Sequence, residues 1–345
     1  MSAEPKVSVV MPVRDAATWL AAAVESILGQ TLKEFELIII DDGSTDRSPE
    51  IAAALSRSED RVRFIAEPHS LGLVRTLNKA ITLSHAPLIA RLDADDVALP
   101  ERLALQLGCF DRKPSLVLLG SWAERMNQHG RSTGRVRPVA DPQRLGAILA
   151  ERNPFVHSSV MMRADAVKAV GGYRAAFLGA EDYDLWLRLA ERGAIANLPQ
   201  PLVRYRVHAG GVSAQFAVRQ CFSARLARLA AAERRGTGFD PAARLIEPPD
   251  WWAADATAEF YAEAASICRF LDLADANVLA AHHPAEVSLP SVAAIREFSR
   301  AEKRLARRSL INLMKVKERS RALSLGRLAA ALLTTLLRRA AYQAG

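Results

Sequence analysis

Two adjacent carboxylates, Asp41 and Asp42, directly follow an apolar run at residues 37–40 and come just before a glycine. Such a run is typical of a strand that is buried on both faces of a parallel sheet. In open α/β folds, ligands bind at the carboxyl ends of these strands. The two acids could therefore contact a polar ligand, or they could only end the strand and cap the next helix.

A second group of acids, Asp93, Asp95 and Asp96, follows another apolar run. Residues two apart in an extended backbone point to the same side, so Asp93 and Asp95 are expected to lie close together. Like charges at short range are unfavourable unless a cation neutralises them. Mg²⁺ and Mn²⁺ prefer such oxygen ligands, often together with substrate phosphates. The spacing predicts a metal–diphosphate site, and the alternative is a chance tripeptide in a loop.

A third group, Glu181, Asp182 and Asp184, begins a segment whose apolar residues have helical spacing. Acids in the first turn of a helix interact favourably with its dipole, and this explanation suits Glu181 and Asp184. The chemical alternative is that one of these carboxylates is a general base that faces a substrate. The helical pattern by itself leaves both explanations open.

The elements that would position these acids alternate between strand-like and helix-like segments, which indicates a parallel sheet with helices on both faces. The expected strands are 7–13, 35–40, 62–67 and 87–96, and the expected helices are 15–30, 47–57, 72–84 and 99–110. The pattern then loosens, with strands expected at 115–126, 158–163 and 201–208 and a helix at 180–193. From about residue 212 onward the chain is expected to be helical.

Length and composition exclude several classes of protein. The 345 residues suggest one large domain with an appendage, or two domains. Three widely spaced cysteines form neither a metal nor a disulfide pattern, so a reducing cytosol is expected. We see no secretory signal pattern and no apolar run long enough to span a bilayer.

Positive charge is concentrated near the C-terminal end. Residues 300–345 hold 12 Lys and Arg against 2 Glu, so they account for the whole net charge of +8. The rest of the chain is slightly acidic, which argues against a nucleic-acid partner. The segment 325–343 places arginines on one helical face and leucines on the other. It could lie on an anionic membrane, or it could pack on the body or in a homodimer.

Eight motifs occur in order along residues 5–215: VSVVMPVRDAATWLAAAVESILGQT, FELIIIDDGSTD, LNKAI, RLDADD, NPFVHSSVMMR, GGYR, AEDYDLWLRL and YRVHAGGVS. With these motifs the chain resembles the family-2 glycosyltransferases that have the A-type nucleotide-diphospho-sugar transferase fold. The resemblance implies an α/β fold, with a Rossmann-like, mostly parallel sheet flanked by helices. It implies a catalytic domain at 1–215, made of a nucleotide-binding half (1–110) and an acceptor-binding half (111–215), and a helical C-terminal region at 216–345.

The resemblance also implies roles on the nucleotide side. Asp42 would hold the uracil or the ribose, because a carboxylate accepts hydrogen bonds from N–H and O–H groups, whereas Asp41 is expected to be structural. Asp95 corresponds to the ligand that joins Mn²⁺ or Mg²⁺ to the diphosphate, and Asp93 to an acid near the ribose and the metal. Asp96 could share the metal, but it is expected to cap a helix. The other candidates are Pro12, Val13, Arg14, Arg75 and Asn78. For the last two, surface or packing roles are equally open.

On the acceptor side, Asp182 corresponds to the base that deprotonates the attacking hydroxyl, and Glu181 is expected to shape the acceptor site. The resemblance implies inversion at the anomeric carbon. His208 would complete the metal or diphosphate site, and a packing role is its alternative. The remaining acceptor-side candidates are Gly171, Gly172 and His157.

The leading interpretation is a metal-dependent inverting glycosyltransferase that moves one sugar from a UDP- or dTDP-sugar to a glycan or lipid-linked acceptor in bacterial polysaccharide biosynthesis. A cytoplasmic location is expected, at the inner face of the plasma membrane if segment 325–343 binds lipid. The Gln-x-x-Arg-Trp motif of processive synthases is absent, which favours single-sugar transfer. The alternatives are a non-catalytic sugar-nucleotide scaffold and a nucleotidyltransferase, which would need a glycine-rich loop that residues 11–20 lack.

Overall fold

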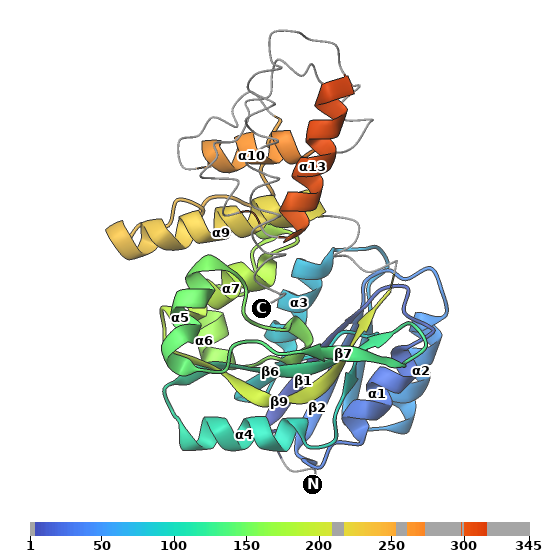
Figure 1. The fold of residues 1–345 in the computed structure, drawn as a ribbon. Coiled ribbons are helices and arrows are strands. Elements are labelled where there is room, and N and C mark those ends of the chain that lie inside the picture. The colour runs from blue at the N-terminus through green and yellow to red at the C-terminus, as the bar shows by residue number, and fades with distance from the viewer. Residues whose placement is uncertain (1–3, 209–216, 253–260, 273–297, 299, 316–345) are drawn as a thin grey trace, which may run out of the picture. The chain divides into compact units, whose positions relative to one another are not determined.

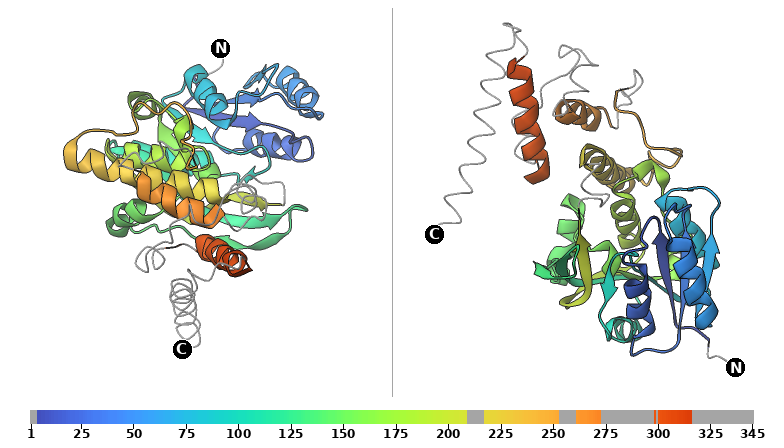
Figure 2. Two further views of the ribbon diagram at one scale, coloured as in Figure 1. Left: turned by 90° about the horizontal axis from the view of Figure 1, so that it is seen from above. Right: turned by 90° about the vertical axis from the view of Figure 1, so that its right-hand side faces the viewer.

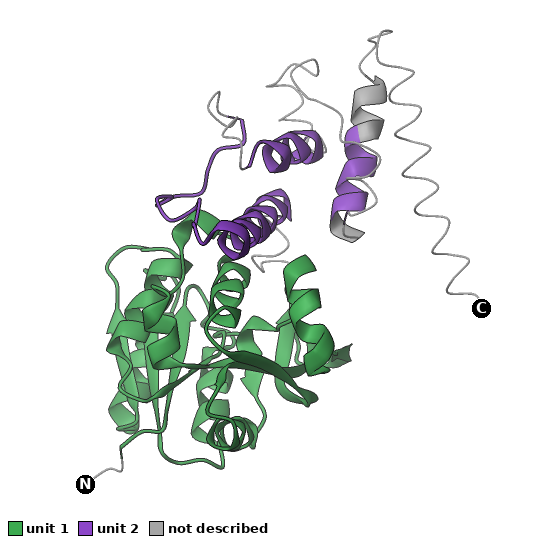
Figure 3. Cartoon of the chain, turned by 90° about the vertical axis from the view of Figure 1, so that its left-hand side faces the viewer, with its two compact units in different colours: residues 1–211 green, residues 212–345 purple. Residues whose placement is uncertain are grey.

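A computed structural model describes residues 4–208, 217–252, 261–272, 298 and 300–315. The chain divides into two compact units, residues 1–211 and residues 212–345 (Figure 3). This division falls four residues before the boundary expected from the motifs. Within the described ranges, no helix has both the length and the apolar character needed to cross a membrane.

The first half of unit 1 contains four parallel strands in the order β3-β2-β1-β4. Figure 1 labels the two central strands of this half, β1 and β2. All seven residues of β2 are buried, as expected for an apolar run with helices on both sides. Between these strands the chain forms helices, of which α1 and α2 pack on each other. The elements are β1 (Val7–Val13), α1 (Leu20–Leu28), β2 (Phe35–Asp41), α2 (Ser48–Ser58), β3 (Val62–Ala66), α3 (Leu73–Leu83) and β4 (Leu88–Arg91).

The second half of unit 1 extends the same sheet with mixed strand directions. Strand β8 (Met161–Arg163) pairs antiparallel with both β4 and β6 (Leu116–Asn127), and β6 runs parallel to β9 (Ala194–Val207). Two short strands complete the sheet: β5 (Val97–Ala98) pairs with β9, and β7 (Ser132–Val136) pairs with β6. The helices of this half are α4 (Arg102–Arg112), α5 (Pro142–Glu151), α6 (Ala164–Ala169) and α7 (Glu181–Ala190).

Several predicted boundaries were wrong. Helix α1 begins at Leu20 and not at Asp15, because Asp15 has a φ of 49° and accepts hydrogen bonds from Thr45 instead. Strand β9 begins seven residues earlier than predicted. Strands β5 and β7 and helices α5 and α6 were missed; β5 has only two residues, and four of the five residues of β7 are exposed, so neither has an apolar pattern.

The core of unit 1 lies between the sheet and its helices, which Figure 2 shows from two further directions. Trp186 of α7 is completely buried, in agreement with its prediction as a core residue. Its ring makes edge contacts with Phe155, His157 and Tyr173, at centroid distances of 6.1, 5.8 and 6.4 Å. This aromatic group connects α7 to the loop before β8.

The described part of unit 2 is helical, as expected. It contains α9 (Ala217–Thr237), α10 (Ala262–Asp272) and α13 (Arg300–Lys315). The buried side chains of Arg225 on α9 and Glu302 on α13 form an ion pair at 2.6 Å. The segment 325–343, predicted to be an amphipathic helix, lies outside the described residues.

Candidate active site

The ends of β1, β2 and β4 bring two of the three acid groups to one edge of the sheet. Val13 is paired with Asp41 in the parallel register, and the Asp42 N–H donates to the Val13 carbonyl at 2.8 Å. On the other side of β1, Val10 is paired with Arg91, two residues before Asp93. The carboxyl edge therefore carries the groups that the sequence placed there, because parallel strands end on the same side.

Asp42 is buried, and its carboxylate accepts hydrogen bonds from four residues at or near the start of α3. The donors are the Ser70 hydroxyl at 2.8 Å, the Leu71 N–H at 2.6 Å, the Gly72 N–H at 3.1 Å and the Thr76 hydroxyl at 3.0 Å. The carboxylate therefore holds the 70–72 loop in place. These protein donors occupy its oxygens. The contact with the uracil or the ribose stays a prediction.

Two other residues flank this loop. Arg14 is exposed, donates to the Ser70 hydroxyl at 2.6 Å and lies 4.0 Å from the Asp42 carboxylate. Asp41 is buried and accepts the Ser44 N–H at 3.0 Å, and its other oxygen has no partner among the described residues. These contacts suit the structural role expected of Asp41.

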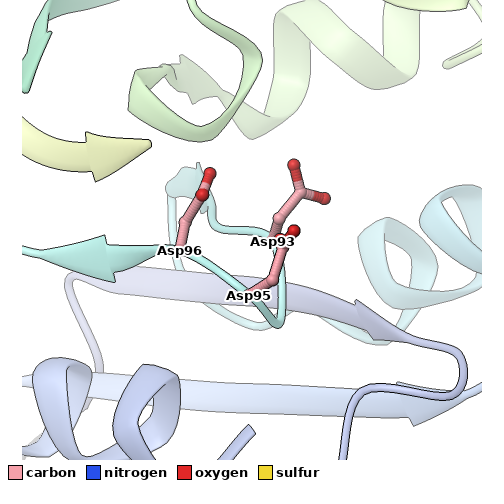
Figure 4. Close-up of side chains that lie close together, drawn as sticks. All are labelled: Asp93, Asp95 and Asp96. Carbon is pink, nitrogen blue, oxygen red and sulfur yellow. The ribbon is translucent and has the colours of Figure 1, made fainter. Parts of the chain in front are cut away.

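The carboxylates of Asp93, Asp95 and Asp96 come together on the loop between β4 and β5, and Figure 4 shows them projecting from one side of it. One oxygen from each lies within 4.8 Å of the others. Burial, followed by the charge of Asp93, raises the pKa of Asp95 above its usual value. Burial and the charges of both neighbours raise the pKa of Asp96 further. Three crowded acids of this kind favour a cation among them.

Different partners hold these three acids. The buried Arg91 guanidinium forms a two-pronged ion pair with Asp93, and the Ser158 hydroxyl donates to the same carboxylate at 3.0 Å. Arg91 also donates to Ser158 at 2.8 Å. The Nε2 atom of His208, just after β9, lies 3.0 Å from an oxygen of Asp95. The role of this histidine in metal or diphosphate binding stays a prediction.

The prediction that Asp96 caps a helix was wrong. Its carboxylate accepts the backbone N–H of Arg206 at 2.7 Å, and helix α4 begins only at Arg102. The second oxygen of Asp96 is buried and has no partner among the described residues. Buried polar atoms are nearly always hydrogen-bonded, so this oxygen is a candidate ligand for a cation.

Trp19 was not singled out by its sequence position, yet it lies beside His208, which contacts Asp95. Its ring centroid is 4.7 Å from that of His208, and the Arg206 guanidinium lies 5.4 Å from the Trp19 ring centroid. Arg206 also donates to the backbone carbonyl of Asp95 at 2.7 Å. Trp19 lies just before α1 in an apolar pattern, so no sequence signal separated it from ordinary core residues.

The acid pair Glu181 and Asp182 begins α7. Glu181 accepts the Gly179 N–H at 2.7 Å, and Asp182 accepts the Asn153 amide at 2.8 Å and the Tyr183 N–H at 2.6 Å. Burial and the charge of Asp182 raise the pKa of Glu181 to about 7. Burial also raises the pKa of Asp182, although the hydrogen bond from Asn153 opposes this. Raised carboxyl pKa values of this kind suit a general base near neutral pH.

Tyr173 and Arg91 interact electrostatically with residues of both acid groups. Burial raises the pKa of the Tyr173 hydroxyl, and the charges of Asp182, Glu181 and Asp93 raise it further, whereas the Arg91 guanidinium lowers it. The same guanidinium lowers the pKa of both members of the acid pair. The loop before β8 also contacts both groups, because Asn153 donates to Asp182 and Ser158 donates to Asp93.

Two predicted residues, Asn78 and His157, have structural contacts, whereas Arg75 and Pro12 differ in exposure. The side-chain amide of Asn78 is bonded to the backbone of Tyr173 on both sides, which favours its packing alternative. The His157 ring bonds to the Tyr173 hydroxyl at 2.8 Å, and burial and Arg91 keep its pKa well below the usual value. Arg75 is exposed on α3. Pro12 is half-buried at the end of β1.

Comparison with known proteins identifies similar sequences. Residues 8–171 match the model of glycosyl transferase family 2. The chain is 35% identical over 211 residues to EpsE of Bacillus subtilis, an alignment that covers 60% of this chain and 74% of EpsE. It is 32% identical over 190 residues to the amylovoran biosynthesis glycosyltransferase AmsE of Erwinia amylovora, which covers 54% of this chain and 70% of AmsE.

Solved structures share the fold at low sequence identity. TarS 1–349 of S. aureus in complex with UDP-GlcNAc matches with a TM-score of 0.54 and 17% identity, over 66% of each chain. The mannosyltransferase PcManGT from Pyrobaculum calidifontis in complex with GDP-Man and Mn²⁺ matches with a TM-score of 0.52 and 18% identity, over 97% of this chain and 87% of that one. These matches confirm the predicted A-type fold.

Proposed function

Because this chain belongs to glycosyltransferase family 2, we propose that it is a metal-dependent, inverting enzyme that moves one sugar from a UDP- or dTDP-sugar to an acceptor hydroxyl. The observation that carries the proposal is that the loop before β8 contacts both acid groups, through Asn153 on Asp182 and Ser158 on Asp93. One group suits a metal and a diphosphate, and the other suits a base. A donor and an acceptor would meet between them.

The residues of the metal-side group fit a hard divalent cation. Asp93, Asp95 and Asp96 offer carboxylate oxygens within 4.8 Å of one another, and one buried oxygen of Asp96 has no partner in the part of the chain that the structure describes. We assign Asp95, Asp93 and His208 as the residues that would hold Mn²⁺ or Mg²⁺. When bound, such an ion stabilises negative charge on the leaving diphosphate. The Mn²⁺ and GDP-Man named for PcManGT and the UDP-GlcNAc named for TarS support this kind of donor.

On the acceptor side, we assign Asp182 as the general base. Its carboxylate would accept the proton of the attacking hydroxyl, and the Asn153 amide would keep that carboxylate turned toward the site. The nearby charge of Arg91 favours the ionised form of Asp182, which a base requires. A positioned base of this kind contributes about 10²- to 10⁴-fold to the rate.

We infer that the acceptor belongs to a bacterial cell-surface polysaccharide or a related glycoconjugate. The support is similarity to AmsE, whose name describes amylovoran biosynthesis. Glu181 and the turn at Gly171 and Gly172 are the proposed acceptor-side residues.

Calorimetric titration of UDP into the full chain tests the donor and metal assignments. We expect UDP to bind with Mn²⁺ present, and we expect EDTA or Asp95→Ala to abolish that binding. Asp165→Ala, which removes an exposed acid on α6, is the matched control and should bind like the original chain. Titrations of dTDP and GDP identify the base. UDP affinity that is unchanged by EDTA and by Asp95→Ala would contradict the metal site. The absence of binding of any nucleoside diphosphate would contradict the donor class.

A further inference from the structure

Asp184, two residues after Asp182, has a completely buried side chain that binds two guanidinium groups. Arg174 donates to both of its oxygens, with Nε 3.0 Å from Oδ2. Arg188, one helical turn further along α7, donates to the same carboxylate through Nε at 3.0 Å and Nη2 at 2.6 Å. The helix dipole alone was the sequence-based explanation for Asp184, and these contacts show a stronger cause for an acid at this position.

Arg188 also holds the glycine turn that follows α6. Its Nη1 donates to the Val170 carbonyl at 2.6 Å, and its Nη2 donates to the Gly172 carbonyl at 2.7 Å. Gly171 and Gly172 have φ angles of 79° and 70°, a conformation that favours glycine. Arginine can bind a carboxylate and two carbonyls together because its five donors lie in one planar fork. A single buried side chain therefore ties α7 to this turn.

Asn78 holds the same turn from α3. Its Oδ1 accepts the Tyr173 N–H at 2.9 Å, and its Nδ2 donates to the Tyr173 carbonyl at 2.8 Å. A Cβ atom added to Gly172 would lie 2.5 Å from Asn78 Oδ1, which shows how closely the two segments approach. The turn is therefore held from two sides, by an amide and by a guanidinium.

Arg174 extends these contacts to the segment just before the acid pair. Its guanidinium carbon lies 4.5 Å from the centroid of the Phe177 ring, and Phe177 is completely buried. Two residues later, the Gly179 N–H donates to Glu181. The Arg174–Asp184 ion pair thus joins the start of segment 174–181 to helix α7, which begins at the end of that segment.

We propose that Arg174, Asp184 and Arg188 form a positioning network that sets the place of Asp182 relative to the acceptor. This inference rests on the proposed function of Asp182 as the base. A buried ion cluster adds little net stability compared with well-packed apolar residues, so the effect expected of this network is on geometry. A displacement of about 1 Å at a reacting group can lower the rate about 100-fold.

The first test compares Arg188→Lys with Arg63→Lys. Arg63 is a matched control, because its Nη1 also donates both to a carboxylate, that of Glu36 at 3.2 Å, and to a carbonyl, that of Leu83 at 2.9 Å. It lies toward the opposite, amino-terminal edge of the sheet. We expect Arg188→Lys to lower kcat/KM for the acceptor about 10- to 100-fold, with UDP affinity within about twofold of the original. Arg63→Lys should change neither quantity.

The second measurement needs no transfer activity. Hydrogen exchange of the backbone amides in residues 171–182 should be faster in Arg188→Lys than in the original chain, and unchanged in Arg63→Lys. If Arg188→Lys does not fold, Asp184→Asn keeps the side-chain shape and can be compared with Glu36→Gln in the same way. Unchanged exchange in residues 171–182 would overturn the proposal, as would equal loss of activity in the test and control variants.

These two readouts separate the inference from the proposed function. A chain that binds no sugar nucleotide would contradict the proposed function, while the exchange result would still decide whether the network holds residues 171–182. Normal UDP binding and normal transfer in Arg188→Lys would contradict the network and leave the proposed function intact.

Discussion

The metal-side cluster (Asp93, Asp95 and Asp96) and the helix cluster (Glu181, Asp182 and Asp184) contain the same kinds of residue but have different surroundings. In the metal-side cluster, one guanidinium and one imidazole face three carboxylates. In the helix cluster, two guanidinium groups bind the same carboxylate, that of Asp184. Within the described ranges, the carboxylates of the other two acids of the helix cluster accept hydrogen bonds from neutral donors only.

This difference separates the acids with a raised pKa from the acids that bind a guanidinium group. Four acids have a raised pKa, and burial is the largest cause for each: Asp95, Asp96, Glu181 and Asp182. Among the described residues, no guanidinium group is hydrogen-bonded to the carboxylate of any of these four; Arg206 reaches only the backbone carbonyl of Asp95. The acids that bind a guanidinium, Asp93 and Asp184, are held in fixed positions by it. Position along the chain does not separate the two kinds, because both occur within each cluster.

The largest expected effect comes from removing the charge of Asp182. Asp182→Asn should lower kcat for sugar transfer about 10²- to 10⁴-fold, because the base is lost, while the affinity for UDP and Mn²⁺ stays unchanged. Steady-state kinetics and calorimetry measure the two quantities. Asp165→Asn, at an exposed acid of α6, is the control. Full activity in Asp182→Asn would contradict the assignment of Asp182 as the base, and another acid would then have that role.

A smaller effect is expected on stability in the turn that the helix cluster holds. Gly172→Ala should lower the free energy of unfolding by about 1–3 kcal/mol, because it adds strain at positive φ and a contact 2.5 Å from Asn78. Gly171→Ala should cost less, about 1 kcal/mol, since a Cβ there meets nothing within 4 Å. Urea denaturation measures both. Equal losses would show that the close approach of Asn78 is unimportant.

The smallest expected effect is a shift along the pH axis. Transfer should fall toward acidic pH, because the base must be ionised and burial raises the pKa of Asp182, which titrates as an interacting pair with Glu181. Glu181→Gln removes a neighbouring negative charge, which lowers the pKa of Asp182. The acidic limb of kcat/KM should therefore move about one unit to lower pH. An unmoved limb would mean that the two carboxyls do not interact.

The same pair affects stability in a defined direction. The pKa of Glu181 is raised in the folded state from 4.5 to about 7, so the folded chain binds more protons than the unfolded chain between these values. Stability should therefore fall as pH rises from about 4.5 to about 7. Glu181→Gln should flatten this dependence in denaturation experiments, with Glu59→Gln as a control at a half-buried acid whose pKa is lowered, not raised.

The parallel half of the sheet could be predicted from the sequence because its strands are apolar throughout and end in polar turns. Strand β2 is buried along its whole length, and its two acids lie at the expected edge. The second half could not be predicted as well. Strand β8 has only three residues and runs antiparallel, and exposed residues in β7 follow no alternating pattern. Short pairings of this kind depend on neighbouring strands and not on local preference.

The sequence by itself determined which acids would gather at the carboxyl edge, since strand ends and residue spacing are local properties. Only the tertiary structure decided which of those acids are neutralised. Arg91 binds Asp93 at the end of the same strand. Arg174 and Arg188 bind Asp184 across a turn and along a helix. His208 contacts Asp95 from the end of a strand more than a hundred residues away. The reason is physical: the pKa and the role of a buried acid depend on the charges that folding places around it.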